Sequence, residues 1–268
     1  MVNIIPMAGL GSRFSEEGYL LPKPLIPVSG MPMIISAIRG LPAADKWIFL
    51  VRKEHVEQFA IDKVIKKEIP GAIIIEIDKT TEGQASTCTL AMPYVDDDEE
   101  ILIAACDNSF LFGEKRLEAL KERADAVVWT FTKNTLLTDK PTAWGWVKIE
   151  NDGETINDMS VKIPVSKDPF NDHAVVATFY FKRAGDFKAA YNAMVEEDFR
   201  INNEFYVDSI PIFLKKLGKK SVIFDVDLYV SFGKPKDLYL YEEKEFQFHY
   251  AKEKLTDPLW VKYFSKLS

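Results

Sequence analysis

The sequence predicts an α/β fold in which a mainly parallel sheet is covered by helices on both faces. In the first half of the chain, short runs of apolar and β-branched residues alternate with helical patterns about 10–15 residues long, which is typical of βαβ units. The chain has 268 residues, 47% of them hydrophobic and 28% charged, which is enough for one large domain or two small ones. In such a fold, ligands bind at the carboxyl ends of the strands.

The expected elements follow one another in a regular order. Up to residue 132 we expect the end of a short helix at 34–39, helices at 53–67 and 114–123, and strands at 3–7, 47–51, 72–77, 101–105 and 125–132. From residue 142 the pattern changes to alternating strands at 143–150, 155–162 and 174–182, with an Asn-Asp-Gly turn at 151–153. Helices at 184–197 and 203–217 and a last strand at 221–227 complete this part.

Charge, cysteine content and hydropathy exclude several classes of protein. The formal net charge of −7 and the pI near 5.2 argue against a general nucleic-acid binder, because such proteins carry basic surfaces. Cys88 and Cys106 lack metal-ligand spacing, and the N-terminus shows no charged and then apolar leader. No apolar run reaches the roughly 18–20 residues that a membrane span needs. We therefore expect a soluble, cytoplasmic protein with no nucleic-acid or membrane partner.

The clearest functional pattern lies in residues 3–33. The apolar run at 3–7 ends in a loop that contains the small residues Ala8, Gly9, Gly11 and Ser12. Glycines let backbone N–H groups approach phosphate oxygens, and successive amides in such a turn make an anion-binding nest. Arg13 adds a fork of donors, and Lys23 stands between two prolines that fix φ on both sides of its charge. These residues predict a polyanion site with a positioned catalytic cation.

Known glycine motifs narrow the kind of polyanion site. A Gly-x-Gly loop also occurs in ordinary strand-to-helix turns that bind nothing. A dinucleotide-binding fingerprint needs a third glycine at the position of Phe14, and a Walker loop needs a terminal Gly-Lys-Ser/Thr, which this chain lacks. What remains is Gly-x-Gly-x-Arg followed by Pro-Lys-Pro. This combination resembles the signature of the nucleotidyltransferases that activate sugar 1-phosphates and small phosphorylated alcohols. The resemblance covers about residues 1–240 and implies a Rossmann-like, three-layer nucleotidyltransferase fold with a small β-rich acceptor-binding subregion.

A second glycine loop follows the strand expected at 72–77. Within residues 80–86, Gly83 can offer an unobstructed amide to a base edge or a phosphate, although on pattern alone a plain N-cap loop is the simpler reading. In the family that the chain resembles, a Gly-rich segment here lines the nucleobase. The resemblance therefore implies that Gly83, Gln84 and Ser86 bind the nucleotide.

Asp107 comes directly after the strand expected at 101–105. A carboxylate at the carboxyl end of a buried strand faces the ligand crevice, where a nucleoside triphosphate brings Mg²⁺. A helix N-cap is the alternative role for an aspartate at such a place. The family has a metal-binding aspartate at this position, so the resemblance implies that Asp107 binds Mg²⁺.

Three residues of the second half match positions at which the family binds its acceptor. Lys162 ends a strand and matches the lysine that holds the acceptor phosphate, although an exposed strand lysine is the ordinary reading. Glu204 and Asp208 stand at i and i+4 in the helix expected at 203–217, which would place both on one face. The resemblance implies that Lys162, Glu204 and Asp208 bind the acceptor.

The segment 229–238 resembles the closing segment of the family, with one departure. The family has a metal-binding aspartate two residues before the glycine, where this chain has Ser231. Asp227 is the expected second metal ligand, with Asp225 or a water molecule as alternatives. The triplet Asp225-Val226-Asp227 also fits the Asp-x-Asp of glycosyltransferases with a related fold.

Residues 241–268 have no counterpart in the family. After Pro258, apolar and aromatic residues recur at helical spacing: Trp260, Tyr263, Phe264 and Leu267. This pattern predicts a helical tail that packs on a nucleotidyltransferase domain of residues 1–240 or forms a subunit contact, in which case the protein is a homo-oligomer.

The implied reaction is the attack of an acceptor phosphate on the α-phosphorus of a nucleoside triphosphate, with release of pyrophosphate. An ionised phosphate needs no general base, so positioning and charge neutralisation by Arg13, Lys23, Lys162 and Mg²⁺ suffice. Size and the Thr-Glu-Gly-Gln segment are most similar to the compact cytidylyltransferases of surface-polysaccharide pathways, which activate phosphocholine or phosphoglutamine. The alternatives are a sugar-1-phosphate uridylyl- or thymidylyltransferase, a glycosyltransferase of related fold, and a non-catalytic sugar-nucleotide binding subunit.

Overall fold

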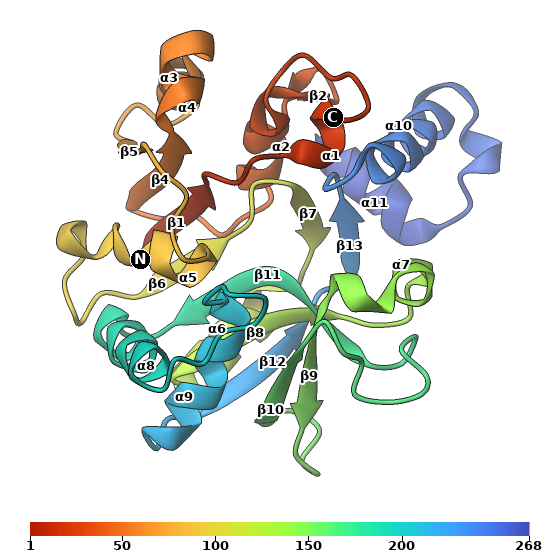
Figure 1. Cartoon of the computed structure of the whole chain (residues 1–268). Coiled ribbons are helices and arrows are strands. Elements are labelled where there is room, and N and C mark those ends of the chain that lie inside the picture. The colour runs from red at the N-terminus through yellow and green to blue at the C-terminus, as the bar shows by residue number, and fades with distance from the viewer. Residues whose placement is uncertain (268) are drawn as a thin grey trace.

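A nine-stranded mixed sheet forms the centre of the molecule (Figure 1). The structure is a computed structural model and describes residues 1–267. The strands of this sheet are β1 (Val2–Met7), β4 (Lys46–Arg52), β5 (Ile73–Ile77), β6 (Ile101–Ala104), β8 (Ala126–Phe131), β9 (Gly145–Ile149), β10 (Ile156–Val161), β11 (His173–Phe181) and β12 (Ser221–Asp225). They lie in the order β10-β9-β11-β6-β1-β4-β5, with β8 beside β11 and β12 beside β8. Each of these strands was expected from its apolar run and lies within two residues of its expected ends.

The sheet is parallel around β1 and antiparallel around β11. Strands β4 and β6 flank β1 in the parallel sense, and β12 is parallel to β8. Strand β11 is antiparallel to β6, β8 and β9, and so joins the β-rich part to the βαβ part. The carboxyl ends of β1 and β6 therefore meet at one edge, where the loop at 8–12 and Asp107 begin.

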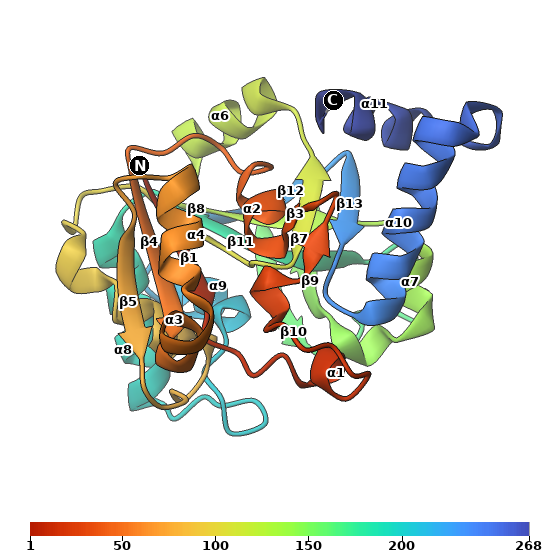
Figure 2. The same ribbon diagram turned by 90° about the horizontal axis from the view of Figure 1, so that it is seen from above.

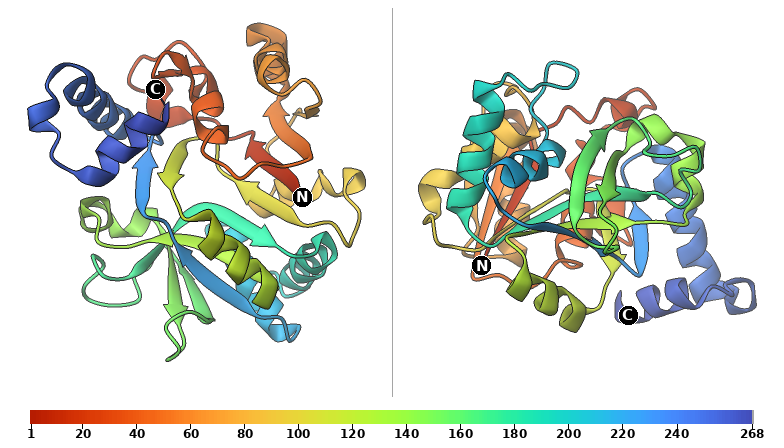
Figure 3. Two further views of the ribbon diagram at one scale, coloured as in Figure 1. Left: turned by 180° about the vertical axis from the view of Figure 1, so that it is seen from behind. Right: turned by 90° about the horizontal axis from the view of Figure 1, so that it is seen from below.

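Helices cover both faces of this sheet. They are α1 (Ser12–Ser15), α2 (Met33–Ile38), α3 (Lys53–Phe59), α4 (Ile61–Glu68), α5 (Gln84–Thr89), α6 (Glu114–Arg123), α7 (Thr135–Asp139), α8 (Ala184–Glu196), α9 (Ile210–Lys216), α10 (Pro235–Tyr250) and α11 (Pro258–Leu267). Short 3₁₀ helices complete the chain: η1 (Lys23–Leu25), η2 (Met92–Tyr94), η3 (Pro141–Ala143), η4 (Val207–Ser209) and η5 (Lys252–Lys254). Figure 1 shows α8 and α9 on the near face, and Figure 3 shows α6 on the opposite face.

Successive residues of the central strands enter different cores. Val128 and Phe179 pack with residues of α5, α8 and α9, whereas their neighbours Trp129 and Tyr180 pack with residues of α6 and α7. Because side chains alternate along a strand, this division means that both faces of the sheet are buried. The predicted three-layer α/β fold is thus confirmed.

Two expected helices differ from the structure. The helix expected at 53–67 is interrupted at Ala60, whose φ of 51° is left-handed, and becomes α3 and α4. The helix expected at 203–217 begins only at η4 and α9, because Asn202 and Asn203 are left-handed and Pro211 stands in the first turn of α9. Asparagine tolerates this backbone, so the segment before η4 turns instead of continuing as a helix.

Two small sheets were not expected. Strands β2 (Pro27–Val28) and β3 (Met31–Pro32) form a short hairpin. Strand β7 (Asn108–Leu111) pairs antiparallel with β13 (Leu228–Ser231), which places Ser231 opposite Asn108. The second pair joins two parts of the chain that are far apart in sequence and brings the closing segment to Asp107.

The C-terminal tail packs against the β7/β13 pair. Seen from above, α10 and α11 lie beside β13, on the side of the molecule away from β4 and β5 (Figure 2). Tyr241 of α10 and Phe264 of α11 share a hydrophobic core with Phe14 and Val230. The expected helix after Pro258 is present as α11. Residue 240 lies inside α10, and a subunit contact through this tail stays a prediction. No helix of the described residues is both long and apolar enough to cross a membrane.

Candidate active site

The loop after β1 presents its backbone to open space. A Cβ placed at Gly9 would meet no heavy atom within 4 Å, and Arg13, in the short helix α1, is exposed. Gly11 has a left-handed φ of 65°, and a Cβ there would lie 3.0 Å from Cβ of Lys23. The glycine is therefore required for the turn and for close packing of the loop against Lys23. This arrangement leaves room for an anion along the loop.

Lys23 forms an ion pair with Asp107, a residue 84 positions further along the chain. Both side chains are largely buried, with exposed fractions of 19% and 24%. Burial is the largest single effect and acts to lower the pKa of Lys23, and Arg13 acts in the same direction. The charge of Asp107, the interaction with Cys106 and the hydrogen bond to Asp107 together outweigh them and raise the pKa above the ordinary lysine value. Lys23 is therefore a fixed ammonium, and the fold brings together two residues that were predicted for different roles.

Ser231 and Asp237 adjoin Asp107 from the other side. The backbone N–H of Phe232 donates to the carbonyl oxygen of Asp107 at 2.8 Å, and a Cβ at Gly233 would lie 3.1 Å from Oδ2 of Asp107. Oγ of Ser231 donates to Oδ2 of Asp237 at 2.7 Å and accepts from the N–H of Gly233 at 3.3 Å. Asp237 is buried in the first turn of α10. Asp237 was not a predicted site residue. Its position in the closing segment at 229–238, shortly after Pro235, is the sequence feature that could have indicated it.

The residues around Asp107 fit a magnesium ion brought by a nucleotide. Mg²⁺ prefers oxygen ligands and usually takes one or two carboxylates together with substrate phosphates. Asp107 offers a carboxylate beside the glycine loop, and the missing Cβ of Gly233 keeps the space next to it free. Among residues 1–267 there is no group of three or more His, Cys, Asp or Glu side chains that could hold a metal without a substrate.

Asp227 lies away from Asp107. It precedes β13, whose first residue, Leu228, faces Leu111, whereas Ser231 at the other end of the strand faces Asn108. The carboxylate of Asp227 pairs with Arg116 at 3.2 Å. The structure therefore does not bring Asp227 together with Asp107.

Asp225 lies at the end of β12 and has partners of its own. Its Oδ1 accepts from Thr130 at 2.6 Å and lies 3.0 Å from Nδ1 of His173. Of the carboxylates considered for the second ligand position, both Asp225 and Asp227 are thus occupied by other contacts.

Gly83 is locked against the segment that leads to Asp208. Its φ is 128°, and a Cβ there would lie 2.6 Å from the backbone N and O of Phe205. The N–H of Phe205 donates to the carbonyl of Glu82 at 2.7 Å, and the N–H of Ala85 donates to the carbonyl of Phe205 at 3.0 Å. The loop predicted for the nucleobase and the segment predicted for the acceptor are therefore one hydrogen-bonded unit.

The two polar residues after Gly83 differ in their surroundings. Gln84 begins α5 and is partly exposed. Ser86 is buried, and its Oγ accepts a hydrogen bond from the hydroxyl of Tyr191 at 3.0 Å. Gln84 is therefore more available to a nucleotide than Ser86.

Lys162 and Asp208 lie near each other on the acceptor side. Lys162 has a left-handed φ of 68°, and its Nζ stands over the ring of Tyr206, 5.4 Å from the ring centre. Burial raises the pKa of Asp208 to about 6, and a backbone hydrogen bond and the charge of Lys162 oppose this rise. The carboxylate of Asp208 packs against Gly145, where a side chain would collide with it.

Glu204 does not share a helical face with Asp208. It is exposed, it pairs with Ile201 in an isolated β-bridge, and its Cβ lies 3.1 Å from the Cβ position of Gly83. The expectation that Glu204 and Asp208 lie one turn apart on a helix is wrong, because the backbone turns at Asn202 and Asn203.

Comparison with known proteins agrees with this geometry. Residues 3–151, more than half of the chain, match the model of the MobA-like NTP transferase domain. The chain belongs to this family. The match includes the loop at 8–12, Lys23, Gly83 and Asp107, and it confirms the family that the sequence resembled. The chain is therefore a nucleotidyltransferase of the NTP transferase family. No curated protein matches it.

Several solved structures share the fold of this NTP transferase. A nucleoside-diphosphate-sugar pyrophosphorylase from Vibrio cholerae RC9 is similar with a TM-score of 0.74 and 23% identity, over 91% of this chain and 100% of that one. The inositol-1-phosphate CTP transferase from T. maritima has a TM-score of 0.67 and 16% identity, over 90% of this chain and 93% of that one. A UTP-bound UGPase from Acinetobacter baumannii has a TM-score of 0.67 and 15% identity, over 99% of this chain and 98% of that one. At these identities the likeness shows the fold.

Proposed function

We propose that this NTP transferase moves CMP from CTP onto the phosphate of a small acceptor of the phosphocholine or phosphoglutamine type and releases pyrophosphate. The observation that carries the proposal is the contact between Lys23 and Asp107 beside the Gly11 turn. This contact supports the proposal, because a cation and a carboxylate stand beside the loop that we expect to bind the triphosphate. We place the enzyme in the cytoplasm, in the synthesis of a capsule or another surface polysaccharide.

The proposed chemistry is positioning and charge neutralisation. Backbone groups of the loop at 8–12 bind the phosphates, and Arg13 and Lys23 neutralise the charge that develops on the leaving pyrophosphate. Mg²⁺ bound by Asp107 would supply further charge neutralisation on the phosphate oxygens. The acceptor phosphate is already a nucleophile, so no side chain has to remove a proton. Because Lys23 forms an ion pair with Asp107, binding of the metal and nucleotide would release Lys23 toward the phosphates.

The preference for CTP has a physical part and a part that follows from the resemblance. A base contacted mainly by backbone around Ala8, Gly9 and Gly83 would meet the short Watson–Crick edge of a pyrimidine. Cytosine over uracil follows from the resemblance. The CTP transferase among the structures of similar fold is consistent with this choice.

The acceptor side combines one cation with carboxylates. Lys162 suits a phosphate, and Asp208 and Glu204 suit an ammonium group, which choline and amino acids carry and a neutral sugar lacks. Glu204 is exposed and adjoins Gly83, so it would lie between the nucleotide and the acceptor.

A substrate panel tests this proposal. The four nucleoside triphosphates are each combined with phosphocholine, phosphoglutamine and several sugar 1-phosphates, and pyrophosphate release is measured in parallel with the Lys23→Ala variant. We expect the highest rate with CTP and a phosphocholine or phosphoglutamine acceptor. A preference for UTP or dTTP with a sugar 1-phosphate would contradict the substrates and leave the reaction class intact. No release with any pair would favour a non-catalytic binding subunit.

A further inference from the structure

Lys234 is a cation of the closing segment at 229–238 that has no role in the site described so far. It directly precedes α10 and is half-buried. Within residues 1–267 its ammonium group has no ion pair and no hydrogen bond, and it stands over the ring of Trp144, with Nζ 5.9 Å from the ring centre. Charged groups that are withdrawn from water usually have a partner of opposite charge. Lys234 is therefore available to an anionic ligand.

The backbone beside Lys234 adjoins Asp107. The N–H of Phe232 donates to the carbonyl oxygen of Asp107 at 2.8 Å, and a Cβ at Gly233 would lie 3.1 Å from Oδ2 of the same residue. Figures 1 and 2 show the loop between β13 and α10 beside α1, and Phe14 of α1 shares a hydrophobic core with Phe232. Lys234 thus lies next to the carboxylate and the glycine loop of the donor side.

Trp144 connects Lys234 to the acceptor side. The carbonyl oxygen of Trp144 accepts from the backbone N–H of Lys162 at 2.8 Å. The next residue, Gly145, packs against the carboxylate of Asp208. Two lysines therefore adjoin the same tryptophan, Lys162 through the backbone and Lys234 through the ring.

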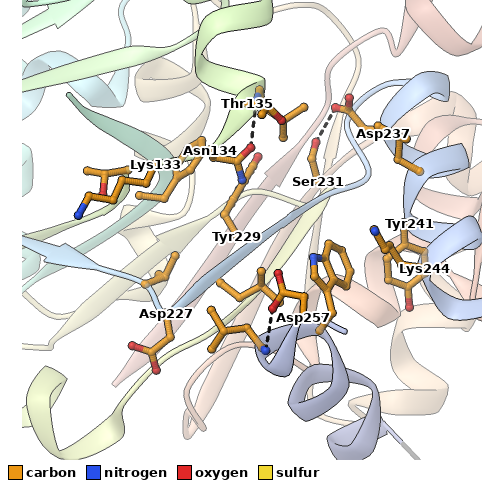
Figure 4. A pocket seen from close by; sticks show the side chains of 18 residues that line it. Lys133, Asn134, Thr135, Asp227, Tyr229, Ser231, Asp237, Tyr241, Lys244 and Asp257 are labelled. Carbon is orange, nitrogen blue, oxygen red and sulfur yellow. Dashed lines mark hydrogen bonds between the residues drawn. The ribbon is translucent and has the colours of Figure 1, made fainter. Parts of the chain in front are cut away.

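The carboxylates near Lys234 do not pair with it. Asp107 forms its ion pair with Lys23. Asp237, three positions along the chain, accepts from Oγ of Ser231 at 2.7 Å, and Figure 4 shows this hydrogen bond at one end of a cavity of about 470 Å³ between β13 and α10. Around Asp107 and Trp144 the described residues nevertheless include more cations than carboxylates, namely Arg13, Lys23, Lys162 and Lys234 against Asp107, Asp208 and Asp237.

We propose that Lys234 binds the acceptor phosphate together with Lys162. This role rests on the proposed transfer to a phosphate acceptor. The terminal oxygens of a phosphomonoester can accept from both ammonium groups, while one remaining oxygen attacks the α-phosphorus and displaces pyrophosphate. Because Lys234 adjoins both Asp107 and Trp144, it holds the acceptor phosphate close to the phosphates of the nucleotide.

Steady-state kinetics with the substrate pair that the wild type uses best tests this role. Lys234→Gln removes the charge and keeps most of the length of the side chain. It should raise the KM for the acceptor by about tenfold or more, the effect of losing a charged hydrogen bond, and change the KM for the nucleotide by less than about twofold. Lys234→Arg keeps the charge and should bring the acceptor KM back to within about threefold of the wild type.

Lys236 provides the matched control. It lies in the first turn of α10, is exposed and pairs with Asp139 at 3.2 Å. Lys236→Gln makes the same change of charge and should leave both KM values unchanged, and thermal melts establish that each variant is folded. An acceptor KM that is unaffected by Lys234→Gln, or raised as much by Lys236→Gln, would overturn the role of Lys234 and leave the proposed function intact.

A binding measurement tests Lys234 without turnover. Inorganic pyrophosphate, whose linked phosphates resemble the diphosphate that forms between the substrates, is titrated calorimetrically into the Arg13→Ala protein, in which the glycine loop has lost its exposed cation. Lys234→Gln in the same background should weaken this binding by about tenfold. If no substrate pair is turned over, the proposed function fails, and equal affinities for pyrophosphate in the two proteins would overturn the role of Lys234 as well.

Discussion

The donor side and the acceptor side of the proposed site are built in different ways. The donor side consists of the ends of the parallel strands β1 and β6 and the turns after them, and it lies within the family match at 3–151. On the acceptor side, Lys162 and Asp208 stand in irregular segments, one with a left-handed backbone and one in a 3₁₀ helix. Strand order determines the positions of the first set, and long-range packing determines those of the second.

The two sides are nevertheless joined at one point. Phe205 exchanges backbone hydrogen bonds with Glu82 and Ala85 on either side of Gly83. A change in the loop around Gly83 is therefore expected to move the segment around Phe205 as well. The following experiments disrupt the donor side, the junction and the acceptor side in turn.

The largest effect should come from the cations of the donor side. Lys23→Ala and Arg13→Ala should each lower turnover by about 10² to 10³, the range for losing one preorganised donor of charge, with little change in folding. Steady-state pyrophosphate release measures the effect, and Lys63→Ala on the surface of α4 is the control. Near-normal release by both variants would make the loop structural.

The metal contact of the donor side comes next. Activity should require Mg²⁺ and vanish on chelation, and Asp107→Asn should raise the Mg²⁺ concentration for half-maximal rate by about tenfold or more. Ser231→Ala should do little, because its hydroxyl is engaged by Asp237. Full activity in excess chelator would refute the metal site. A severe loss in Ser231→Ala would instead assign this hydroxyl a direct role.

A substitution at the junction should affect both sides at once. Gly83→Ala places a Cβ against the backbone of Phe205 at a φ that L-residues rarely adopt, so we expect a loss of about 1–3 kcal/mol in stability and higher KM values for both substrates. Gly71→Ala, where a Cβ meets no atom within 4 Å, is the matched control. If only the KM for the nucleotide rose in Gly83→Ala, the two sides would be independent.

The smallest effect concerns Asp208 and pH. Its pKa is raised from near 3.8 to about 6, so the folded protein holds this proton more tightly than the unfolded chain does. Stability that protonated Asp208 contributes is present below about pH 4 and is lost as pH rises through about 6. Relative to Asp208→Asn, the wild type should lose about 2 kcal/mol of unfolding free energy over this interval and none above it.

Denaturant unfolding between pH 4 and 8 measures this difference. Glu204→Gln, in the same segment but exposed, should change stability by less than about 0.5 kcal/mol throughout. Parallel pH profiles for the wild type and Asp208→Asn would show that folding leaves the pKa of Asp208 unchanged and would contradict the effect of its burial.

Local sequence was sufficient to predict the strands of the central sheet, and together with the family resemblance it predicted the residues of the donor side. The apolar runs that became β1 and β6 are short and rich in β-branched residues, which favours buried strands over helices, and the residues after such strands lie at the carboxyl edge of the sheet. Gly11, Lys23 and Asp107 could therefore be located before any contact between them was known. Three residues also argued locally against a single helix at 203–217. Asn202 and Asn203 tolerate a left-handed backbone, and Pro211 favours the first turn of a helix.

Only the tertiary structure decided which of these residues meet. Pairing of β7 with β13 brings Ser231 and Asp237 to Asp107 and leaves Asp227 with Arg116, because the register of two distant strands determines which end of β13 faces the site. The contact of Lys23 with Asp107 and that of Gly83 with Phe205 likewise join segments far apart in the chain. Such contacts depend on how several elements pack together, and the spacing of residues along one segment does not predict that packing.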